Sequence, residues 1–361
     1  MKHYFTLLSG LAIFAALAAQ ALRASPPTYP PVEPGRPLHF PRDHGAHPDY
    51  RTEWWYVTGW LHTDSGAPLG FQLTFFRSRP PLDEANPSHF APKQLLFAHV
   101  ALSDPSTGHL QYDQRGARIG FGLADAITAD TAVSIDGWLL HRGVDGTYFA
   151  TLTAQGFALE LALQPTQAPL LQGESGYSRK GPRPEQASFY YSLPQLTVSG
   201  TVTRRGKPER INGTAWLDHE WASAPLAAEA TGWDWVGLNL DDGGALMVLR
   251  IRDKTGGTYW AGGSWRAADG SIRPLAPDAI TFHPLRHWRS PHTGTDYPVA
   301  MRVQAGGLHL DLAPLMDDQE LDSRATTGAV YWEGAVTAHS AGRTIGRGYL
   351  ELTGYAGRLV Y

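Results

Sequence analysis

The sequence predicts an all-β protein made of two tandem antiparallel β-barrels. Short runs alternate apolar and polar residues, and helical periodicity is nearly absent after residue 24. Glycine-rich and aspartate-rich turn signals separate these runs, and one tryptophan-rich pattern occurs twice. The chain holds 39 Gly and 27 Pro, and only 18% of its residues are charged. Such a composition is typical of many short strands joined by tight turns.

The alternating runs identify the expected strands. They lie at 70–76, 147–154, 157–164, 245–251 and 308–315. Alternation places every second side chain on the same face, which is the period of a strand with one buried face. The turn signals "DSG", "DDGG" and "KTGG" indicate that neighbouring strands are joined as hairpins.

Two parts of the chain repeat one arrangement of a tryptophan-rich strand, a glycine turn and a strand that ends at Arg. The first part begins with "EWWYV" at 53–57 and the second with "WDWV" at 233–236. The ends also match, because "WLD" at 216–218 corresponds to "YLE" at 349–351. A repeat of this kind predicts two similar units. Closing each sheet into a barrel removes exposed strand edges, and two β-sandwiches are the alternative.

The N-terminus reads as a secretory signal peptide over residues 1–24. Lys2 precedes an apolar run from Phe5 to Ala19, and a small-x-small cleavage motif follows at 19–21. This run is too short for a spanning helix, although an uncleaved anchor is the alternative. We expect a periplasmic protein, secreted across the inner membrane, with no membrane span in the mature chain. A proline-rich tail over 25–39, extended and unpacked, should precede barrel domains at 40–221 and 222–361.

Bulk composition removes several classes of function. A net charge of −4 does not indicate the basic surface that binds nucleic acid. The absence of Cys rules out disulfides and thiolate ligands. Histidines in "DHGAHPD", His44 and His47, and in "HPLRHWRSPH" lack a strong metal-ligand spacing, so we expect surface-loop histidines, no metal and no cofactor. The run "GYSRKG" has Lys180 where the Gly-x-Ser-x-Gly motif of a serine hydrolase needs Gly, so a serine hydrolase is not expected.

The run "WLDHEW" at 216–221 places two acids on one strand face. Asp218 and Glu220 alternate with His219, so they point the same way as Trp216. If that face is enclosed, desolvation and mutual repulsion raise the pKa of at least one carboxyl group, which then carries a proton near neutral pH. If that face is exposed to water, both acids ionise and the pair does not indicate a functional site.

Asp234 and Glu53 are a second pair of candidate acids. Each falls on an otherwise apolar face near the start of its predicted strand. A buried carboxylate needs a partner or a raised pKa, and the candidates for such partners are His219 and either Arg250 or Arg252. The alternative is that both acids lie at strand ends and face water.

Several motifs together resemble the AttH-like and carotenoid 1,2-hydratase (hydroxyneurosporene synthase) superfamily. They are "AHPDYRTEWWYVTGWL" at 46–61, "GYSRKG", "SFYYS", "GTAWLDHEW" at 213–221 and "GWDWVGLNLDDGGALM" at 232–247. The resemblance implies two lipocalin-like β-barrels packed against each other. It also implies either cofactor-free hydration of a carotenoid double bond or, for exported AttH-like members, association with ABC-transporter permeases. The signal peptide and the "EWWY" run resemble the exported branch most.

We therefore expect an exported protein that binds an elongated apolar ligand, a lipid or an isoprenoid polyene, near the junction of the two domains. An ABC-transporter permease is the expected protein partner. The alternative is a hydro-lyase, or an isomerase or cyclase, in which a buried acid protonates an alkene and water adds. The candidate catalytic residues are Asp218, Asp234, His219 and Glu220. The candidate ligand-binding residues are Glu53, Trp54, Trp55, Tyr56, Tyr190, Trp216, Trp221, Trp233 and Trp235.

Overall fold

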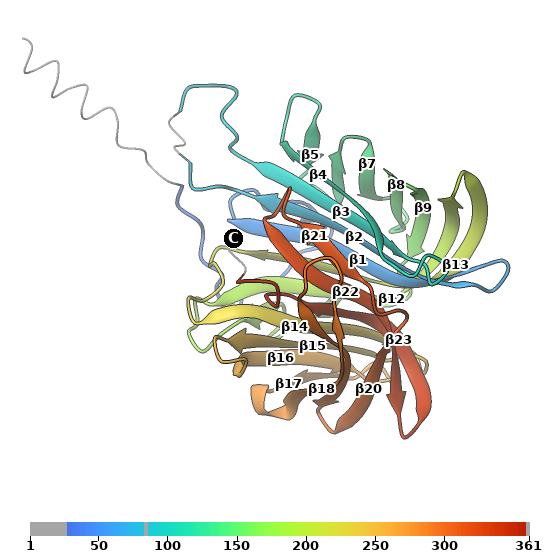
Figure 1. Cartoon of the computed structure of the whole chain (residues 1–361). Coiled ribbons are helices and arrows are strands. Elements are labelled where there is room, and N and C mark those ends of the chain that lie inside the picture. The colour runs from blue at the N-terminus through green and yellow to red at the C-terminus, as the bar shows by residue number, and fades with distance from the viewer. Residues whose placement is uncertain (1–26, 83–85, 359–361) are drawn as a thin grey trace, which may run out of the picture.

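The computed structural model describes residues 27–82 and 86–358, and it is all-β, as predicted (Figure 1). Two antiparallel sheets account for the strands, one of 13 strands and one of 10. The described helices are two short 3-10 turns, η1 (Arg42–His44) and η2 (Pro277–Ala279). None of the helices in the described ranges has the length and hydropathy needed to cross a bilayer. The predicted signal peptide lies outside the described residues.

The 13-stranded sheet, called the first barrel below, runs in the order β4-β3-β2-β1-β13-β12-β9-β8-β7-β6-β5, with β10 and β11 paired to β12. Its strands are β1 (Thr52–Thr63), β2 (Pro68–Ser78), β3 (Leu95–Ser103), β4 (Gln111–Arg118), β5 (Ala124–Ala126), β6 (Ala132–Ile135), β7 (Trp138–Arg142), β8 (Tyr148–Ala154), β9 (Phe157–Gln164), β10 (Leu170–Leu171), β11 (Tyr177–Arg179), β12 (Ala187–Arg204) and β13 (Lys207–Ala222).

The 10-stranded sheet, called the second barrel, runs in the order β17-β16-β15-β14-β23-β22-β20-β19-β18, with β21 paired to β22. Its strands are β14 (Ala230–Leu240), β15 (Ala245–Asp253), β16 (Thr258–Arg266), β17 (Ile272–Leu275), β18 (Ile280–Arg289), β19 (Asp296–Ala305), β20 (Leu308–Pro314), β21 (Glu320–Ser323), β22 (Ala329–Ser340) and β23 (Arg343–Leu352). The five runs predicted as strands are found in β2, β8, β9, β15 and β20.

The two barrels repeat one pairing scheme. In the first, β1 lies between β13 and β2; in the second, β14 lies between β23 and β15. Tyr56 stands opposite Asp218, and Trp235 stands opposite Glu351 in the same way. The match between "WLD" and "YLE" predicted from the sequence is therefore visible in the strand register.

Buried apolar residues form one core within each barrel and a third between them. Because strand side chains alternate, β1 sends Trp55, Val57 and Leu61 into the first core. The same strand sends Tyr56 and Trp60 to the interface with the second barrel. The sheets approach closely there: a Cβ added to Gly70 would lie 2.6 Å from Ala335 Cβ, so glycine is needed at that position.

The N-terminal strap, residues 27–50, closes over the first barrel. Its proline-rich part, predicted to be an unpacked tail, is in fact packed against the barrel. Val32 belongs to the core of the first barrel, and the Tyr29 hydroxyl donates to Arg79 O at 2.8 Å. The prediction that His44 and His47 lie on the surface is also wrong, because their exposed fractions are 5% and 3%. The strap supplies side chains to the barrel interior, which loop composition alone does not reveal.

Candidate functional site

The outer faces of β1, β12 and β13 meet the outer faces of β14, β22 and β23, and this contact is called the junction below (Figure 1). Its aromatic residues come from both barrels. They are Trp54, Tyr56, Trp60, Tyr190 and Trp216 from the first, and Trp233, Trp235 and Tyr349 from the second. Alternation along β13 turns Asp218 and Glu220 towards the junction and His219 and Trp221 into the first barrel.

Asp218 lies at the centre of a hydrogen-bond network in the junction. Its exposed fraction is 2%. Oδ1 accepts from Ser192 Oγ at 2.5 Å and from Trp216 Nε1 at 2.6 Å, and Oδ2 accepts from the Tyr190 hydroxyl at 2.6 Å. Trp235 Nε1 donates to the same Tyr190 hydroxyl at 3.1 Å. The network thus links a strand of the second barrel to the acid of the first.

Burial raises the pKa of Asp218 to about 7, because the ionised form loses its hydration. The hydrogen bonds from Ser192, Tyr190 and Trp216 oppose this rise, and the charge of Glu220 adds to it. A carboxyl group with this pKa exchanges its proton near neutral pH, which is the property expected of a general acid.

Glu220 has the junction's one ion pair with a cation among the described residues. Lys180 Nζ lies 3.0 Å from Glu220 Oε1 and 3.0 Å from Ser178 Oγ. The same ammonium group lies 4.7 Å from the centre of the Tyr190 ring. Lys180 therefore rests against both a carboxylate and an aromatic face.

The second barrel contributes two further acids, Glu333 and Glu351, which are cross-strand neighbours on β22 and β23. Burial raises the pKa of Glu333 well above its usual range, and the charge of Glu351 adds to the effect. Burial also raises the pKa of Glu351 to about 7, helped by Asp218 and Glu220, while a hydrogen bond from Trp233 opposes it. Two adjacent buried acids without a cation cannot both ionise readily, so the pair retains a proton.

Three buried side chains in the junction have polar partners: Glu220 Oε1 faces Lys180 Nζ at 3.0 Å, and the Tyr56 hydroxyl faces the Glu333 carboxyl group. The exposed fractions of Tyr56, Glu220 and Glu333 are 7%, 5% and 4%. Buried polar groups in folded proteins are nearly always paired, and these three follow that rule. Here three of them gather where the two barrels meet.

The interior of the first barrel holds a different cluster, centred on Glu53. Oε1 accepts from His47 Nδ1 at 2.7 Å and from His219 Nε2 at 2.9 Å. Oε2 accepts from Arg77 Nε at 2.7 Å and from the His47 backbone N–H at 2.9 Å. Although burial opposes ionisation, Arg77 and the two histidines hold the pKa of Glu53 well below its usual range.

His47, Glu53 and His219 are also a group that could hold a metal ion. Glu53 Oε1 already accepts three hydrogen bonds and Oε2 accepts two, and Arg77 balances the charge of the carboxylate. His47 Nε2 faces Asp43 Oδ1 at 3.1 Å, so both of its ring nitrogens already contact carboxylates. Its ring also stacks on Trp221, with centroids 3.7 Å apart. These contacts describe a complete hydrogen-bonded cluster and do not favour a metal centre.

Asp234 takes the corresponding place inside the second barrel. It stands opposite Arg250, as Glu53 stands opposite Arg77. Arg250 binds Oδ2, Arg252 Nε lies 3.2 Å from Oδ1, and the Tyr355 hydroxyl donates to Oδ1 at 2.9 Å. Both of the arginines considered from the sequence are thus partners of Asp234, and His219 is the partner of Glu53.

The structure therefore divides the candidate residues among three places. Asp218 and Glu220 share the junction with six predicted ligand-binding residues, which are Trp54, Tyr56, Tyr190, Trp216, Trp233 and Trp235. Glu53, Trp55, His219 and Trp221 lie inside the first barrel, and Asp234 lies in the second. The four candidate catalytic residues are not brought together. Sequence reasoning missed Glu333 and Glu351, although Glu351 was the repeat counterpart of Asp218.

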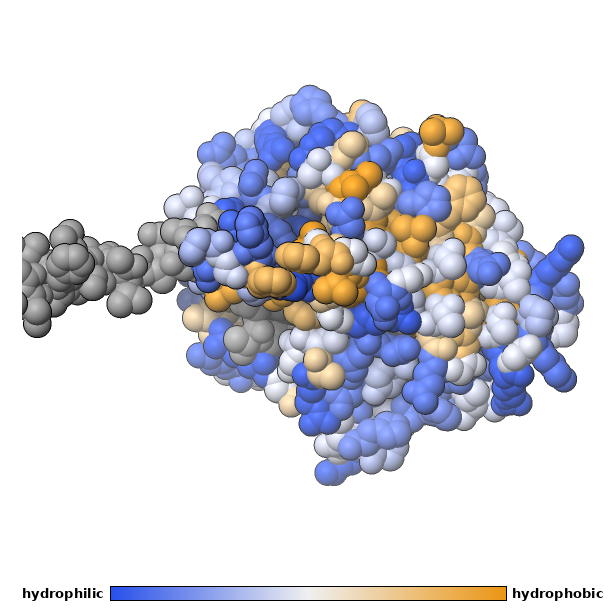
Figure 2. All heavy atoms as spheres, turned by 90° about the horizontal axis from the view of Figure 1, so that it is seen from above, coloured by the Kyte–Doolittle hydropathy of each residue, from blue (hydrophilic) through white to orange (hydrophobic). Residues whose placement is uncertain are grey.

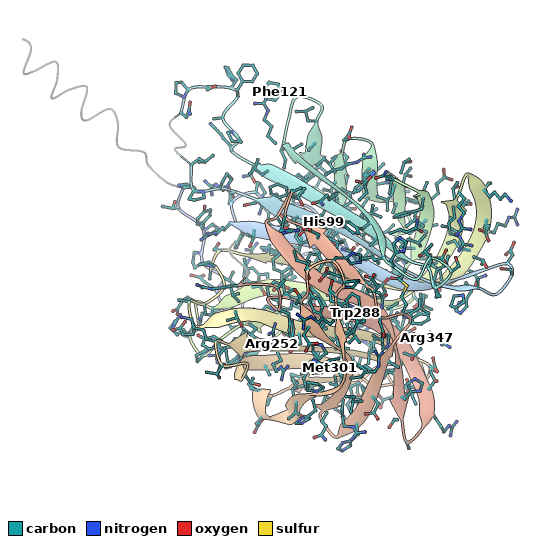
Figure 3. All side chains as sticks on the ribbon, viewed as in Figure 1. His99, Phe121, Arg252, Trp288, Met301 and Arg347 are labelled. Carbon is teal, nitrogen blue, oxygen red and sulfur yellow. The ribbon has the colours of Figure 1, made fainter. Side chains whose placement is uncertain are left out.

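A second tether joins the barrels away from these acids. His99 of β3 contacts the Tyr331 hydroxyl and Thr326 Oγ1 of the second barrel, each at 2.8 Å (Figure 3). Burial lowers the pKa of His99 to about 3, so the ring stays neutral over the physiological range.

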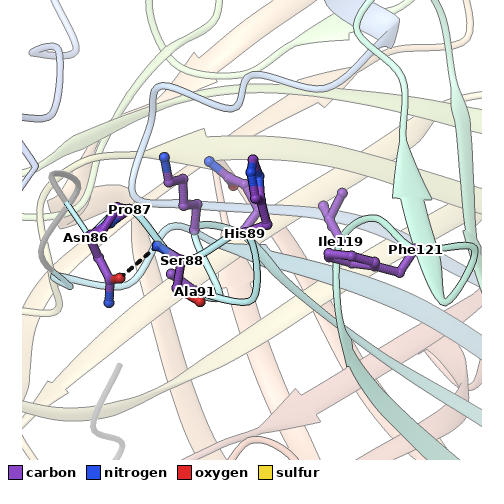
Figure 4. Close-up of a pocket in the computed structure, with 9 residues that line it drawn as sticks. Asn86, Pro87, Ser88, His89, Ala91, Ile119 and Phe121 are labelled. Carbon is purple, nitrogen blue, oxygen red and sulfur yellow. Dashed lines mark hydrogen bonds between the residues drawn. The ribbon is translucent and has the colours of Figure 1, made fainter.

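A surface pocket of about 370 Å³ lies elsewhere, on the outside of the first barrel (Figure 4). Its lining includes Lys93, Ile119 and Phe121. Phe90 and Phe121 stack beside it, with Arg118 over both rings. Hydrophobic residues lie among hydrophilic ones on this upper face (Figure 2). The pocket shares no residue with the junction.

The fold and the junction define a protein of two packed antiparallel barrels with a buried acidic and aromatic interface. A family described as AttH-like matches residues 31–355, and the chain belongs to this family. An AttH candidate of Nitrosomonas europaea is 54% identical, with a TM-score of 0.85, and the match covers 90% of this chain and 99% of that one. A search of curated proteins finds no match.

Two more distant structures share the fold. Kievitone hydratase of Nectria haematococca is 13% identical, with a TM-score of 0.69 over 92% of this chain and 98% of that one. The protein CghA, solved with Sch210972, is also 13% identical, with a TM-score of 0.52 over 85% of this chain and 90% of that one.

Proposed function

We propose that this protein binds an elongated apolar ligand at the junction, with its polar or unsaturated end at the acids. The observation that carries the proposal is the group of acids in the junction, Asp218, Glu220, Glu333 and Glu351, for which Lys180 is the one paired cation among the described residues. They lie beside the aromatic faces of both barrels. Ligand sites commonly combine a mostly apolar lining with a few convergent polar groups and form where domains meet.

A fluorescent polyene fatty acid, cis-parinaric acid, tests this proposal directly. We expect the wild-type protein to bind it and Trp235→Ala to bind it at least tenfold more weakly, since truncating a central aromatic contact typically costs about 2 kcal/mol or more. Trp288→Ala is the control, because Trp288, labelled in Figure 3, belongs to β18 and packs against the core of the second barrel and not against the junction cluster. Native mass spectrometry of the protein purified from its own cells would identify a resident ligand. Failure to bind the probe, with no co-purified lipid, would refute the proposal.

A second candidate function is hydration of an alkene, and the observation that favours it is the pKa of Asp218, about 7. In this reaction Asp218 gives its proton to one alkene carbon, and the neighbouring carbon becomes a tertiary cation. The faces of Trp216 and Trp235 would stabilise that cation by cation–π attraction. Water then bonds to the cation and returns a proton to the carboxylate, so the net change is addition of water. Kievitone hydratase, by its name, belongs to the same reaction class, but its likeness extends to the fold alone.

Incubation with lycopene in ¹⁸O-labelled water tests the hydratase. The wild type should place ¹⁸O in a hydroxylated product, and Asp218→Asn should form none while still binding parinaric acid. Asp234→Asn is a comparison that changes an acid outside the junction. If the wild type forms no labelled product, or if Asp218→Asn forms as much as the wild type, the hydratase function is wrong and the binding function remains.

The cellular setting is also proposed. The apolar run at Phe5–Ala19 supports export to the periplasm, where a carrier of apolar ligands would serve an ABC-transporter permease. Fractionation of cells that express the full chain tests the location, and a cytoplasmic protein with an intact N-terminus would contradict it. Co-purification with the permease tests the partner.

A further inference from the structure

The first barrel carries an exposed aromatic pair at its upper end. Phe90 comes from the loop between β2 and β3, and Phe121 comes from the loop between β4 and β5 (Figure 3). Their side chains are 66% and 60% exposed, and the rings stack with centroids 5.5 Å apart. Leu123, two residues beyond Phe121, is 48% exposed. These three side chains, called the aromatic tip below, are apolar surface that the fold leaves in contact with water.

The backbone holds Phe121 in an unusual conformation. Its φ of 59° lies in the left-handed region, which bulky residues rarely adopt. Gly120 and Gly122 on either side also have positive φ, of 102° and 73°. Strained residues of this kind persist where the surrounding structure enforces them, and they concentrate at functional sites. The strain therefore points to a use for the exposed ring.

Two cations accompany the aromatic tip. The Arg118 guanidinium lies 5.0 Å from the centre of the Phe90 ring and 4.4 Å from that of Phe121, and it donates to Phe90 O at 2.8 Å. Lys93 is exposed and lines the pocket beside Phe121 (Figure 4). Exposed apolar side chains next to Lys and Arg suit the surface of an anionic bilayer, because the rings enter the acyl boundary while the cations meet phosphates.

The point where the chain enters the first barrel indicates on which side a membrane lies. Arg79, the first residue of the loop that carries Phe90, donates to Thr28 O at 3.2 Å. The start of the described chain is thus held at the base of this loop. An extended chain between the apolar run Phe5–Ala19 and Pro27 spans at most about 29 Å. A bilayer that holds this run, during export or afterwards, therefore lies close to the same side of the barrel.

We propose that the aromatic tip docks the protein on the surface of an anionic phospholipid bilayer. Its three apolar side chains enter the boundary between headgroups and acyl chains, and Arg118 and Lys93 contact the phosphates. A bilayer is favoured over a protein partner because the chain carries its own apolar run within reach of the loop that holds Phe90. The inference goes beyond ligand binding at the junction and is independent of it.

A single labelled cysteine reports docking locally, because the natural chain has no Cys. Leu123→Cys carries a nitrobenzoxadiazole label, and Ile272→Cys is the matched control, since both residues are 48% exposed and Ile272 lies on β17 at the lower end of the molecule (Figure 1). Protein purified from cells that express the full chain is mixed with vesicles of equal parts phosphatidylcholine and phosphatidylglycerol. We expect the label at position 123 to brighten and to be quenched by spin-labelled lipid, while the label at position 272 does neither.

Further variants of the labelled protein separate the contributions. Phe90→Ala combined with Phe121→Ala should weaken the response of the Leu123→Cys protein to vesicles at least about tenfold, because burying each phenylalanine contributes about that factor or more. Lys93→Gln should weaken it about fivefold, since it removes a cation near an anionic surface. Lys254→Gln removes an exposed lysine from the turn between β15 and β16, and the response should not change.

Equal responses at the two labelled positions, or no response at position 123, would overturn the inference. It is also wrong if the label at position 123 responds to membranes that contain a permease but not to pure lipid, because the aromatic tip is then a protein contact. Parinaric acid binding is measured on the same preparations, so a failure of docking and a failure of ligand binding at the junction are told apart.

Discussion

The strands β1 and β13 carry buried acids on both faces, and the two faces differ in whether the acid has a cationic partner. On the inner face, Glu53 accepts hydrogen bonds at both oxygens and pairs with Arg77. On the outer face, Asp218 accepts three hydrogen bonds but has no cation among the described residues. A carboxylate balanced in this way stays ionised and locks the strap to the barrel. An acid that is buried without a counter-ion keeps its proton. Its pKa is therefore raised, and the proton is available for transfer near neutral pH.

The largest expected effect is on the inner face. Glu53→Gln leaves Arg77 and His47 buried without their carboxylate, and breaking a buried ion pair in this way costs about 3–5 kcal/mol. Urea unfolding at pH 7 measures the loss. The double variant Glu53→Gln with Arg77→Met should recover part of it, because the uncompensated charge is gone. An unchanged midpoint for Glu53→Gln would mean that this cluster does not hold the strap.

The next effect tests the outer face through pH. The folded-state pKa of Asp218, about 7, lies above its unfolded value, so the folded protein binds the extra proton and loses stability as pH rises from about 4 to 7. Asp218→Asn removes this loss. Its stability relative to the wild type should grow by up to about 4 kcal/mol across that range and then level off. Unfolding curves at pH 4, 5.5, 7 and 8 measure this, and a difference that does not change with pH would contradict the assignment.

A smaller effect is expected from Tyr190→Phe. The Tyr190 hydroxyl donates to Asp218 and accepts from Trp235 Nε1. Its removal should cost about 1–2 kcal/mol, because the indole N–H is left unpaired. It should also move the pKa of Asp218 further upward, since this hydrogen bond favours the ionised form. Repeating the pH series in this background measures both, and a downward movement would show that Tyr190 does not stabilise the carboxylate.

The smallest effect is expected at an exposed ion pair. Arg302 and Asp311 pair on β19 and β20 at 2.6 Å, but their side chains are 49% and 44% exposed. Because water screens such a pair, Asp311→Asn should leave the unfolding midpoint unchanged within error. A loss as large as that of Glu53→Gln would mean that burial is not what separates the two kinds of acid.

Much of the fold could be predicted from residue alternation and the repeat. The two-residue period fixed that Asp218 and Glu220 share a face, and the match of "WLD" to "YLE" placed the strands that close each barrel. The period could not say which face turns inward, because Leu217 and Trp221 are as apolar as Trp216. The structure decides this by packing Trp216 against Trp235 of the other barrel.

The histidines and the second pair of acids were harder to predict. His44 and His47 lie in an irregular segment, where no residue alternation indicates burial, and the Tyr191 partner of His44 is distant in sequence. Glu333 and Glu351 become a pair only through the alignment of β22 with β23. The repeat offered one usable signal, since Glu351 falls where Asp218 falls, and an acid at both positions was a reason to examine the second barrel.

The short connection between β13 and β14, residues 223–229, has a consequence for how such a site arises. Each barrel contributes acids and aromatic rings that lie on its outer surface, so neither barrel alone can form the junction. If the two barrels were separate chains, they would associate only at high concentration. A tether of this length gives each half a local concentration of the other in the millimolar range, so their assembly becomes independent of how much protein the cell makes.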